Sequence, residues 1–173
     1  YHIAGEPMSR GELKGNVVAA ARLLLKAGAD PSAATIDSFG TLSLVYDSRQ
    51  TGWLGIKEEL MTLLLEAGAD PDERRGYLLW SAVRFGQHEM ATLLVANDAT
   101  LDLRTAAHGS LSAMSGFFNE DSTLKATAHS GYRRYFPTRT LIPATPAETL
   151  TEALTLAARA GSADAVELLL NHG

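Results

Sequence analysis

The chain contains no cysteine, which excludes disulfide bonds, zinc–thiolate sites and a cysteine nucleophile. It also lacks a long apolar run. The longest, residues 17–25, spans nine residues and already includes Arg22, whereas a membrane-spanning helix needs about 20 apolar residues. No Walker or dinucleotide-type glycine loop is present, so enzymes that depend on those loops are excluded. These absences predict a chain that does not insert into a membrane and holds no cofactor.

Positive charge is also scarce. The 173 residues include 15 Lys and Arg against 20 Asp and Glu, for a formal net charge of −5. Because affinity for phosphate backbones comes from basic clusters, nucleic acid is an unlikely partner. A hydrophobic fraction of 46% and a charged fraction of 20% are typical of one globular domain or a small tandem array. The absence of cysteine does not fix the compartment; an intracellular, cytoplasmic location is expected.

Several segments of the chain resemble one another. Residues 21–31 read ARLLLKAGADP, residues 61–71 read MTLLLEAGADP, and residues 166–173 read VELLLNHG. A degenerate copy, ATLLVANDAT, occupies residues 91–100. Such self-similarity is the sequence signature of a repeat protein.

Each copy predicts the end of a helix, because apolar residues recur with the helical period up to the triple leucine. Gly28 and Gly68 stand where a left-handed C-terminal cap is expected. Asp98 takes the same place and tolerates that conformation better than most residues. Pro31 and Pro71 follow the first two caps, where a helix could not continue.

Two of these helices are preceded by a second, shorter helix, with Gly86 or Gly161 in the turn between the two. The strings GQHEMATLL at 86–94 and AARAGSADAVELLLNHG at 157–173, with the two LLLxxGAD strings, resemble the ankyrin-repeat family. DSFG at 37–40 resembles that family's hairpin entry. The resemblance covers roughly two thirds of the chain. It implies an all-α, ankyrin-type helix-turn-helix solenoid of about four to five irregular repeats.

The repeats depart from the family pattern in spacing and in sequence. A family repeat has about 33 residues, whereas Gly28 and Gly68 are 40 residues apart and Gly68 and Asp98 are 30 apart. No copy contains Thr-Pro-Leu-His; YLLW and EALT take that place. The chain is expected to be a fragment of a longer array. Its approximate units are residues 1–32, 33–72, 73–102, 103–148 and 149–173.

Residues 103–148 lack the repeat pattern and are interpreted as a degenerate repeat or a long insertion. They hold five basic residues, three acidic residues and five of the twelve aromatic residues. One inner helix is predicted over residues 110–118. The string YRRYF at 132–136 favours a protein contact over stacking on nucleic acid, because Arg and Tyr are enriched at binding hot spots. An ordinary packed loop remains an open alternative.

Enzymatic and metal-dependent functions find little support. None of the five histidines stands at a spacing typical of a metal site, so they are interpreted as surface or turn residues and no metal is predicted. A catalytic cluster would require His108, Glu120, Asp121 and His129 to gather in one pocket. No nucleophile or base motif accompanies these residues, so a solvated loop is the favoured interpretation.

The resemblance implies a protein–protein interaction scaffold that binds another protein on its concave face, with no catalysis of its own. The alternative is a regulatory or targeting segment of a larger enzyme or effector. Turn tips and inner-helix positions carry binding in the family. Carried over to this chain, these positions are Ser38, Phe39, Thr41, Glu73, Arg74 and Gly76 at the tips, and Arg84, Phe85 and Arg159 on the inner helices.

Two further groups of residues are predicted to contact a partner. Trp53 lies between two glycines in a predicted insertion over residues 47–55, where a large side chain is hard to bury. Trp80, in contrast, occupies an inner-helix position and is predicted to be core. The aromatic and basic residues of the degenerate segment complete the set: Tyr132, Arg133, Arg134 and Tyr135.

Overall fold

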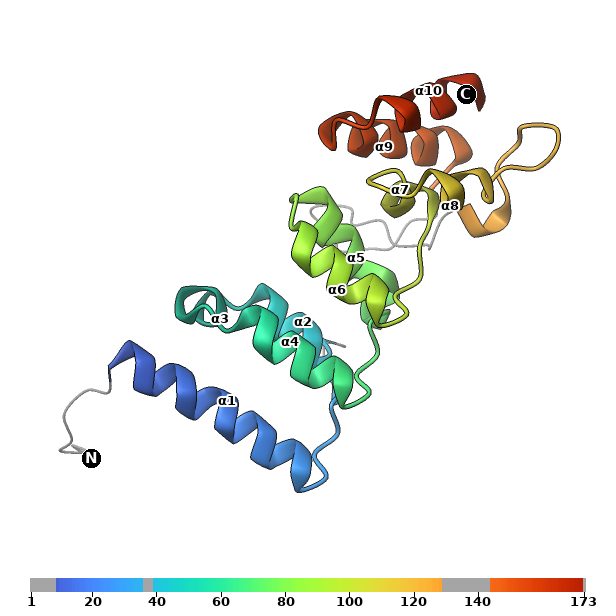
Figure 1. Cartoon of the computed structure of the whole chain (residues 1–173). Coiled ribbons are helices and arrows are strands. Elements are labelled where there is room, and N and C mark those ends of the chain that lie inside the picture. Colours follow the sequence, from blue (N-terminus) through green and yellow to red (C-terminus); the bar gives the residue numbers. More distant parts are fainter. Residues whose placement is uncertain (1–8, 36–38, 129–143, 173) are drawn as a thin grey trace. The chain divides into compact units, whose positions relative to one another are not determined.

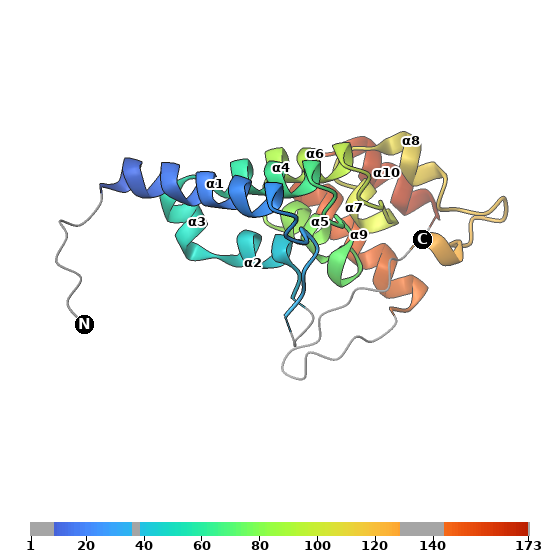
Figure 2. The same ribbon diagram turned by 90° about the horizontal axis from the view of Figure 1, so that it is seen from below.

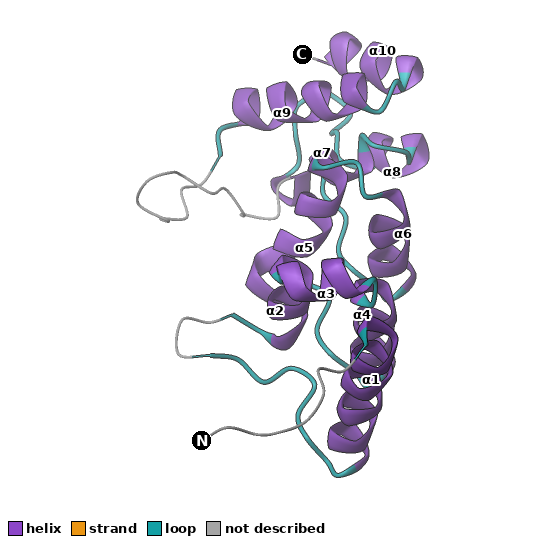
Figure 3. Ribbon diagram, turned by 90° about the vertical axis from the view of Figure 1, so that its left-hand side faces the viewer, coloured by secondary structure: helices purple, strands orange, loops and turns teal. Residues whose placement is uncertain are grey.

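The computed structural model describes residues 9–35, 39–128 and 144–172 (Figure 1). The prediction of a helical protein is confirmed. Within these ranges, β-structure is limited to two isolated bridges, Ala34–Gly40 and Phe118–Leu124 (Figure 3). The chain divides into two compact units, Tyr1–Asp70 and Pro71–Gly173. No helix of the described ranges combines the length and the apolar content that crossing a bilayer requires.

The first unit is organised around its last helix. This helix, α4 (Lys57–Glu66), packs against the three helices that precede it in the unit. The core of the unit includes Val18, Leu54, Ile56 and Leu60. The helix before it, α3 (Arg49–Leu54), falls within the predicted insertion at 47–55. The described helices are α1 (Arg10–Lys26), α2 (Thr41–Asp47), α3 (Arg49–Leu54) and α4 (Lys57–Glu66).

The second unit is a series of helix pairs. Its described helices are α5 (Glu73–Arg84), α6 (His88–Ala96), α7 (Leu103–Ala106), α8 (Leu111–Ser115), the 3-10 turn η1 (Ala126–Ala128), α9 (Pro146–Arg159) and α10 (Ala163–His172). Figure 2 shows α5, α7 and α9 in one row and α6, α8 and α10 in another. The first row is continuous, because α7 packs against both α5 and α9.

The predicted helix caps are confirmed. Gly28, Gly68 and Asp98 have φ values of 88°, 93° and 66°, all in the left-handed region. In each case the next residue donates its N–H to a carbonyl five positions earlier, which satisfies a helix-end acceptor. These bonds are each 3.0 Å long and join Ala29 to Leu24, Ala69 to Leu64 and Ala99 to Leu94. The sequence repeat is therefore a repeat of one local backbone geometry.

The triple leucines differ in burial although they look alike in sequence. Leu64, in the middle of its triplet, is 6% exposed, whereas Leu24 in the same position of α1 is 62% exposed. The difference follows from packing, since α4 is covered by three helices of its unit. Burial at a repeat position therefore depends on the neighbours that a helix has.

The prediction of one inner helix over residues 110–118 is confirmed only in part: α8 covers residues 111–115, and it lies in the row of α6 and α10 (Figure 2). The inner row is continued by α7, at residues 103–106. Asp102 begins α7 early, because its side chain accepts the N–H of Thr105 in a capping box. Phe118 leaves the helical path to form the bridge with Leu124, and its side chain is buried in the core of the second unit.

Candidate functional site

The second unit contains a groove between its first and last inner helices. It has a volume of about 650 Å³. α7 has only 4 residues, whereas α9 has 14 and the regular part of α5 runs from Tyr77, after a left-handed kink at residues 74–76, to Arg84, so α7 leaves parts of its neighbours' faces uncovered. We call this hollow the α5–α9 groove. Its lining consists of Tyr77, Trp80, Ser81, Arg84 and Phe85 from α5, Arg104 from α7, Ala144, and Ala147, Glu148, Thr151, Glu152 and Thr155 from α9.

Helical periodicity explains which side chains line the groove. The α5 residues follow the spacing i, i+3, i+4, i+7 and i+8, which places them on one face of the helix. This face is aromatic and cationic. The α9 face offers small, hydroxyl and carboxylate side chains instead. The two walls therefore differ in chemistry.

A buried ion pair fixes the floor of the groove. The guanidinium of Arg104 is 1% exposed. Its Nε and Nη2 donate to Oδ2 of Asp102 at 3.0 and 2.6 Å, and its Nη1 donates to Oε2 of Glu152 at 3.1 Å. The buried cation is thus paired with carboxylates, as a buried charge requires.

The same network ties the aromatic wall to α9. The indole Nε1–H of Trp80 donates a 2.7 Å hydrogen bond to Oε1 of Glu152. Both carboxylate oxygens of Glu152 therefore accept a hydrogen bond, Oε1 from Trp80 and Oε2 from Arg104. The prediction that Trp80 is core needs correction, because its side chain is half-buried and lines the groove. Its N–H requires a partner, and that partner lies at the groove surface.

The rim of the groove on the α5 side is exposed. The guanidinium of Arg84 lies 5.1 Å from the ring centroid of Trp80, a cation–π contact. Arg84 is exposed and has no carboxylate partner among the described residues. The adjacent Phe85 is 65% exposed. The edge of the α5–α9 groove therefore carries two adjacent residues, the cationic Arg84 and the apolar Phe85.

The structure brings together some predicted site residues and separates others. Arg84 and Phe85 line the groove, whereas Arg159 is exposed on α9 and is not part of the lining. Arg74 lies over the ring of Tyr77, with its guanidinium carbon 4.4 Å from the centroid. Glu73 begins α5, and Gly76 follows in a left-handed conformation. Ser38, Tyr132, Arg133, Arg134 and Tyr135 lie outside the described residues.

The predicted contact residues of the first unit that the structure describes are Phe39, Thr41 and Trp53. Trp53 is 56% exposed, and the guanidinium of Arg10 lies 5.2 Å from its ring centroid. Arg10 also donates to the Trp53 carbonyl. Thr41 donates its hydroxyl to the carbonyl of Ala33 at 3.0 Å, and Phe39 is half-buried beside the Ala34–Gly40 bridge. Thr41 and Phe39 thus serve the local turn.

Arg84 and Phe85 are the two lining residues that the sequence predicted; those it missed include Tyr77, Trp80, Arg104 and Glu152. The spacing of Tyr77, Trp80 and Arg84 on one helical face was a usable signal. The pairing of Arg104 with Glu152 was not, because the two residues are 48 positions apart.

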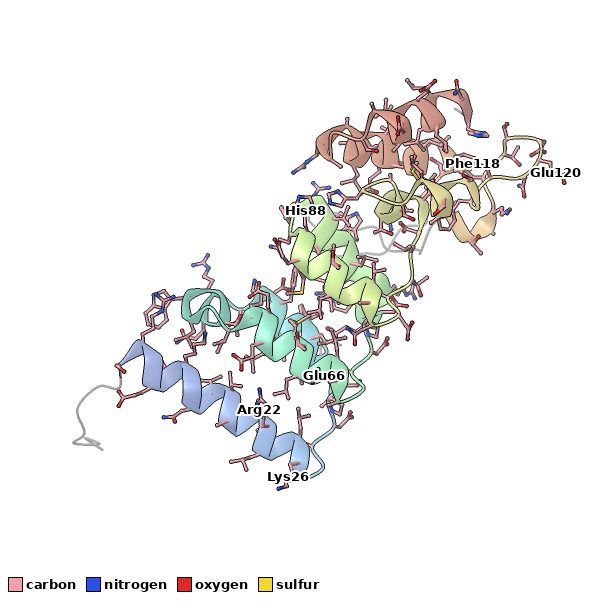
Figure 4. All side chains as sticks on the ribbon, in the orientation of Figure 1. Arg22, Lys26, Glu66, His88, Phe118 and Glu120 are labelled. Atoms are coloured by element: carbon pink, nitrogen blue, oxygen red, sulfur yellow. The ribbon has the colours of Figure 1, made fainter. Side chains whose placement is uncertain are left out.

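The catalytic hypothesis for the degenerate segment is not supported. Asp121 is exposed and accepts hydrogen bonds from the backbone and hydroxyl of Thr123. Glu120 lies at the tip of an exposed loop, away from the end of α6 that carries His88 (Figure 4). The cavity that His108 lines includes neither acidic residue. His129 lies outside the described residues.

His108 instead meets another histidine. Its Nε2 lies 2.8 Å from Nδ1 of His88, and the two rings stack with centroids 4.7 Å apart. Burial, and second the nearby charge of His88, lower the pKa of His108 below its ordinary value. No cluster of three or more potential metal ligands occurs in the described ranges.

Comparison with protein-family models, with curated proteins and with solved structures finds no match to this chain.

Proposed function

We propose that the chain is a protein-interaction module that binds a segment of a partner protein in the α5–α9 groove, without catalysis of its own. On this proposal the helix pairs are irregular repeats of an ankyrin-type solenoid. Two findings support that fold: the recurrent left-handed cap and the continuous row of α5, α7 and α9. An exposed row of inner helices is the surface that such arrays present to partners.

The observation that carries the proposal is the rim of the groove. Arg84 and Phe85 are exposed beside Trp80, and aromatic and arginine side chains dominate binding hot spots. The floor beneath them is held by the pairing of Arg104 with Glu152, so a partner would meet a preorganised surface. Preorganisation lowers the entropic cost of binding.

The same residues indicate the chemistry of the partner. Arg104 is paired with its two carboxylates, whereas Arg84 has no anionic partner among the described residues. A carboxylate of the partner would pair with Arg84, and an apolar side chain would cover Phe85 and the edge of Trp80. We therefore expect a segment with an acidic residue close to an apolar anchor.

The test is selection from a random-peptide phage library on the full chain, followed by affinity measurements with the selected peptides. We expect peptides that combine an acidic and a large apolar residue. Phe85→Ala and Arg84→Glu should each weaken binding by about 30-fold, as for hot-spot residues worth about 2 kcal/mol.

The chain offers matched controls for both variants. Leu170 on α10 is 63% exposed, close to the exposure of Phe85, and it does not line the groove. Leu170→Ala should leave peptide affinity unchanged, and so should Arg159→Glu. Equal losses in the control and groove variants would show that the peptides bind elsewhere.

A further inference from the structure

We propose that His88 and His108 form a binding site for a divalent late first-row transition metal such as Zn²⁺ or Ni²⁺. Nδ1 of His88 lies 2.8 Å from Nε2 of His108. With metal–nitrogen bonds of about 2.0–2.1 Å, two ligand nitrogens stand about 3.3 Å apart in a tetrahedral zinc site and about 2.9 Å apart at a right angle. The two nitrogens are therefore close to ligand spacing, and metal binding requires each ring to turn so that its lone pair points at the ion instead of at the other ring.

The two ligands come from neighbouring helix pairs. His88 is the first residue of α6, and His108 follows α7 closely in the chain. Both positions are fixed by the packing of their helices, since α5 contacts both α6 and α7. The near-parallel rings, 20° apart, are thus held together by the fold across 20 residues of sequence.

The proton balance of metal binding is simple. In the metal-free protein one ring donates its N–H and the other accepts with its lone pair. With a metal between them, both facing nitrogens must present lone pairs, so the donor ring moves its proton to its other nitrogen. Two neutral rings remain neutral, and no net proton is released. Imidazole is a preferred ligand of zinc, nickel and copper.

The surroundings leave room for further ligands. Both rings line a cavity of about 410 Å³, and none of its other lining residues is charged. Thr92, Thr105 and Ser110 contribute hydroxyls, and the remaining lining is apolar or glycine. Water can therefore complete the coordination, and no cation in the lining repels a metal ion.

The test is titration of the full, untagged, chelator-stripped chain with ZnCl₂ and NiCl₂ by isothermal calorimetry. We expect one equivalent of metal to bind and the melting temperature to rise, because a ligand of the native state stabilises it. MgCl₂, which prefers oxygen ligands, should have no effect. His88→Ala and His108→Ala should each weaken zinc binding by about tenfold or more.

His172→Gln is the matched control, because His172 stacks on Phe118 and lies outside the pair. It should leave zinc affinity unchanged. A second measurement does not depend on variants: the ¹⁵N ring resonances of the native protein should shift at Nδ1 of His88 and Nε2 of His108 on addition of Zn²⁺. Absence of zinc and nickel binding, or ring shifts confined to other histidines, would overturn the proposal and leave the pair as a hydrogen bond.

Discussion

Trp80 and Glu152 are joined by a 2.7 Å hydrogen bond between the indole Nε1–H and Oε1, across 72 residues of sequence. The other oxygen of Glu152 accepts from the buried guanidinium of Arg104. One carboxylate therefore connects three helices, α5, α7 and α9. Its removal takes one acceptor from Trp80 and one from Arg104.

Glu152→Ala should lower the free energy of unfolding by about 2–4 kcal/mol, because it leaves the buried Arg104 with one carboxylate less. Glu152→Gln keeps an acceptor for Trp80 but loses the charge, so we expect an intermediate loss. Urea denaturation of the full chain measures both. Glu167→Ala removes an exposed carboxylate of α10 and should change stability by less than about 0.5 kcal/mol. An equal loss of unfolding free energy in Glu152→Ala and Glu167→Ala would show that the hydrogen bonds of Glu152 to Trp80 and Arg104 do not stabilise the fold.

Leu64→Ala should cost about 2–5 kcal/mol, because it removes a buried side chain and leaves a cavity. Leu24→Ala changes the same repeat position in α1, where the side chain is 62% exposed, and should cost less than about 0.5 kcal/mol. Thermal and urea unfolding of the two variants give the comparison. A larger loss for Leu24 than for Leu64 would show that α1 is covered more fully than α4.

Gly68→Val should strongly destabilise the chain, because a β-branched residue resists the φ of 93° at this cap. Asp98→Gly should be neutral or mildly stabilising, since Asp98 already holds a φ of 66° and glycine adopts it without strain. Denaturation midpoints report both changes. An unchanged or raised midpoint for Gly68→Val, together with a lowered midpoint for Asp98→Gly, would refute the shared cap geometry.

The stability of the metal-free chain should fall as the pH drops below about 6.5. The folded pKa of His108 is lowered, so the unfolded chain takes up the proton first, and acid favours unfolding. The stability that neutral His108 contributes is fully present above the pKa of this group in the unfolded chain. It is lost as the pH falls through the pKa of His108 in the folded chain. Denaturation between about pH 7.5 and about pH 5.5, with chelator present, should show a shallower dependence in His108→Gln. An unchanged slope in this variant would assign the dependence to other groups.

The local features of the fold could be predicted from the sequence because they are encoded locally. Gly28 and Gly68 predict left-handed caps, and the helical spacing of the apolar residues before them predicts the helices that these caps end. Asp98 fits the same geometry by the side-chain preference of a single residue. Such features need no knowledge of which helices are neighbours.

The groove could be predicted only in part, because its contacts depend on stacking. Arg84 and Phe85 were found from their place on an inner helix. The partnership of Arg104 and Glu152 depends on the register in which α7 lies against α9, which no local pattern specifies. The meeting of His88 with His108 was missed for the same reason, since sequence spacing does not report contacts between successive helix pairs.

The four-residue length of α7 bears on the order in which the second unit assembles. A single helical turn is unstable by itself, because the entropic cost of fixing its backbone exceeds the free energy gained from its few hydrogen bonds. We therefore expect α7 to become helical only once α9 lies beside it, where Glu152 can accept from Arg104. The floor of the groove is then expected to form after α9 has packed, with α7 completing the row between α5 and α9.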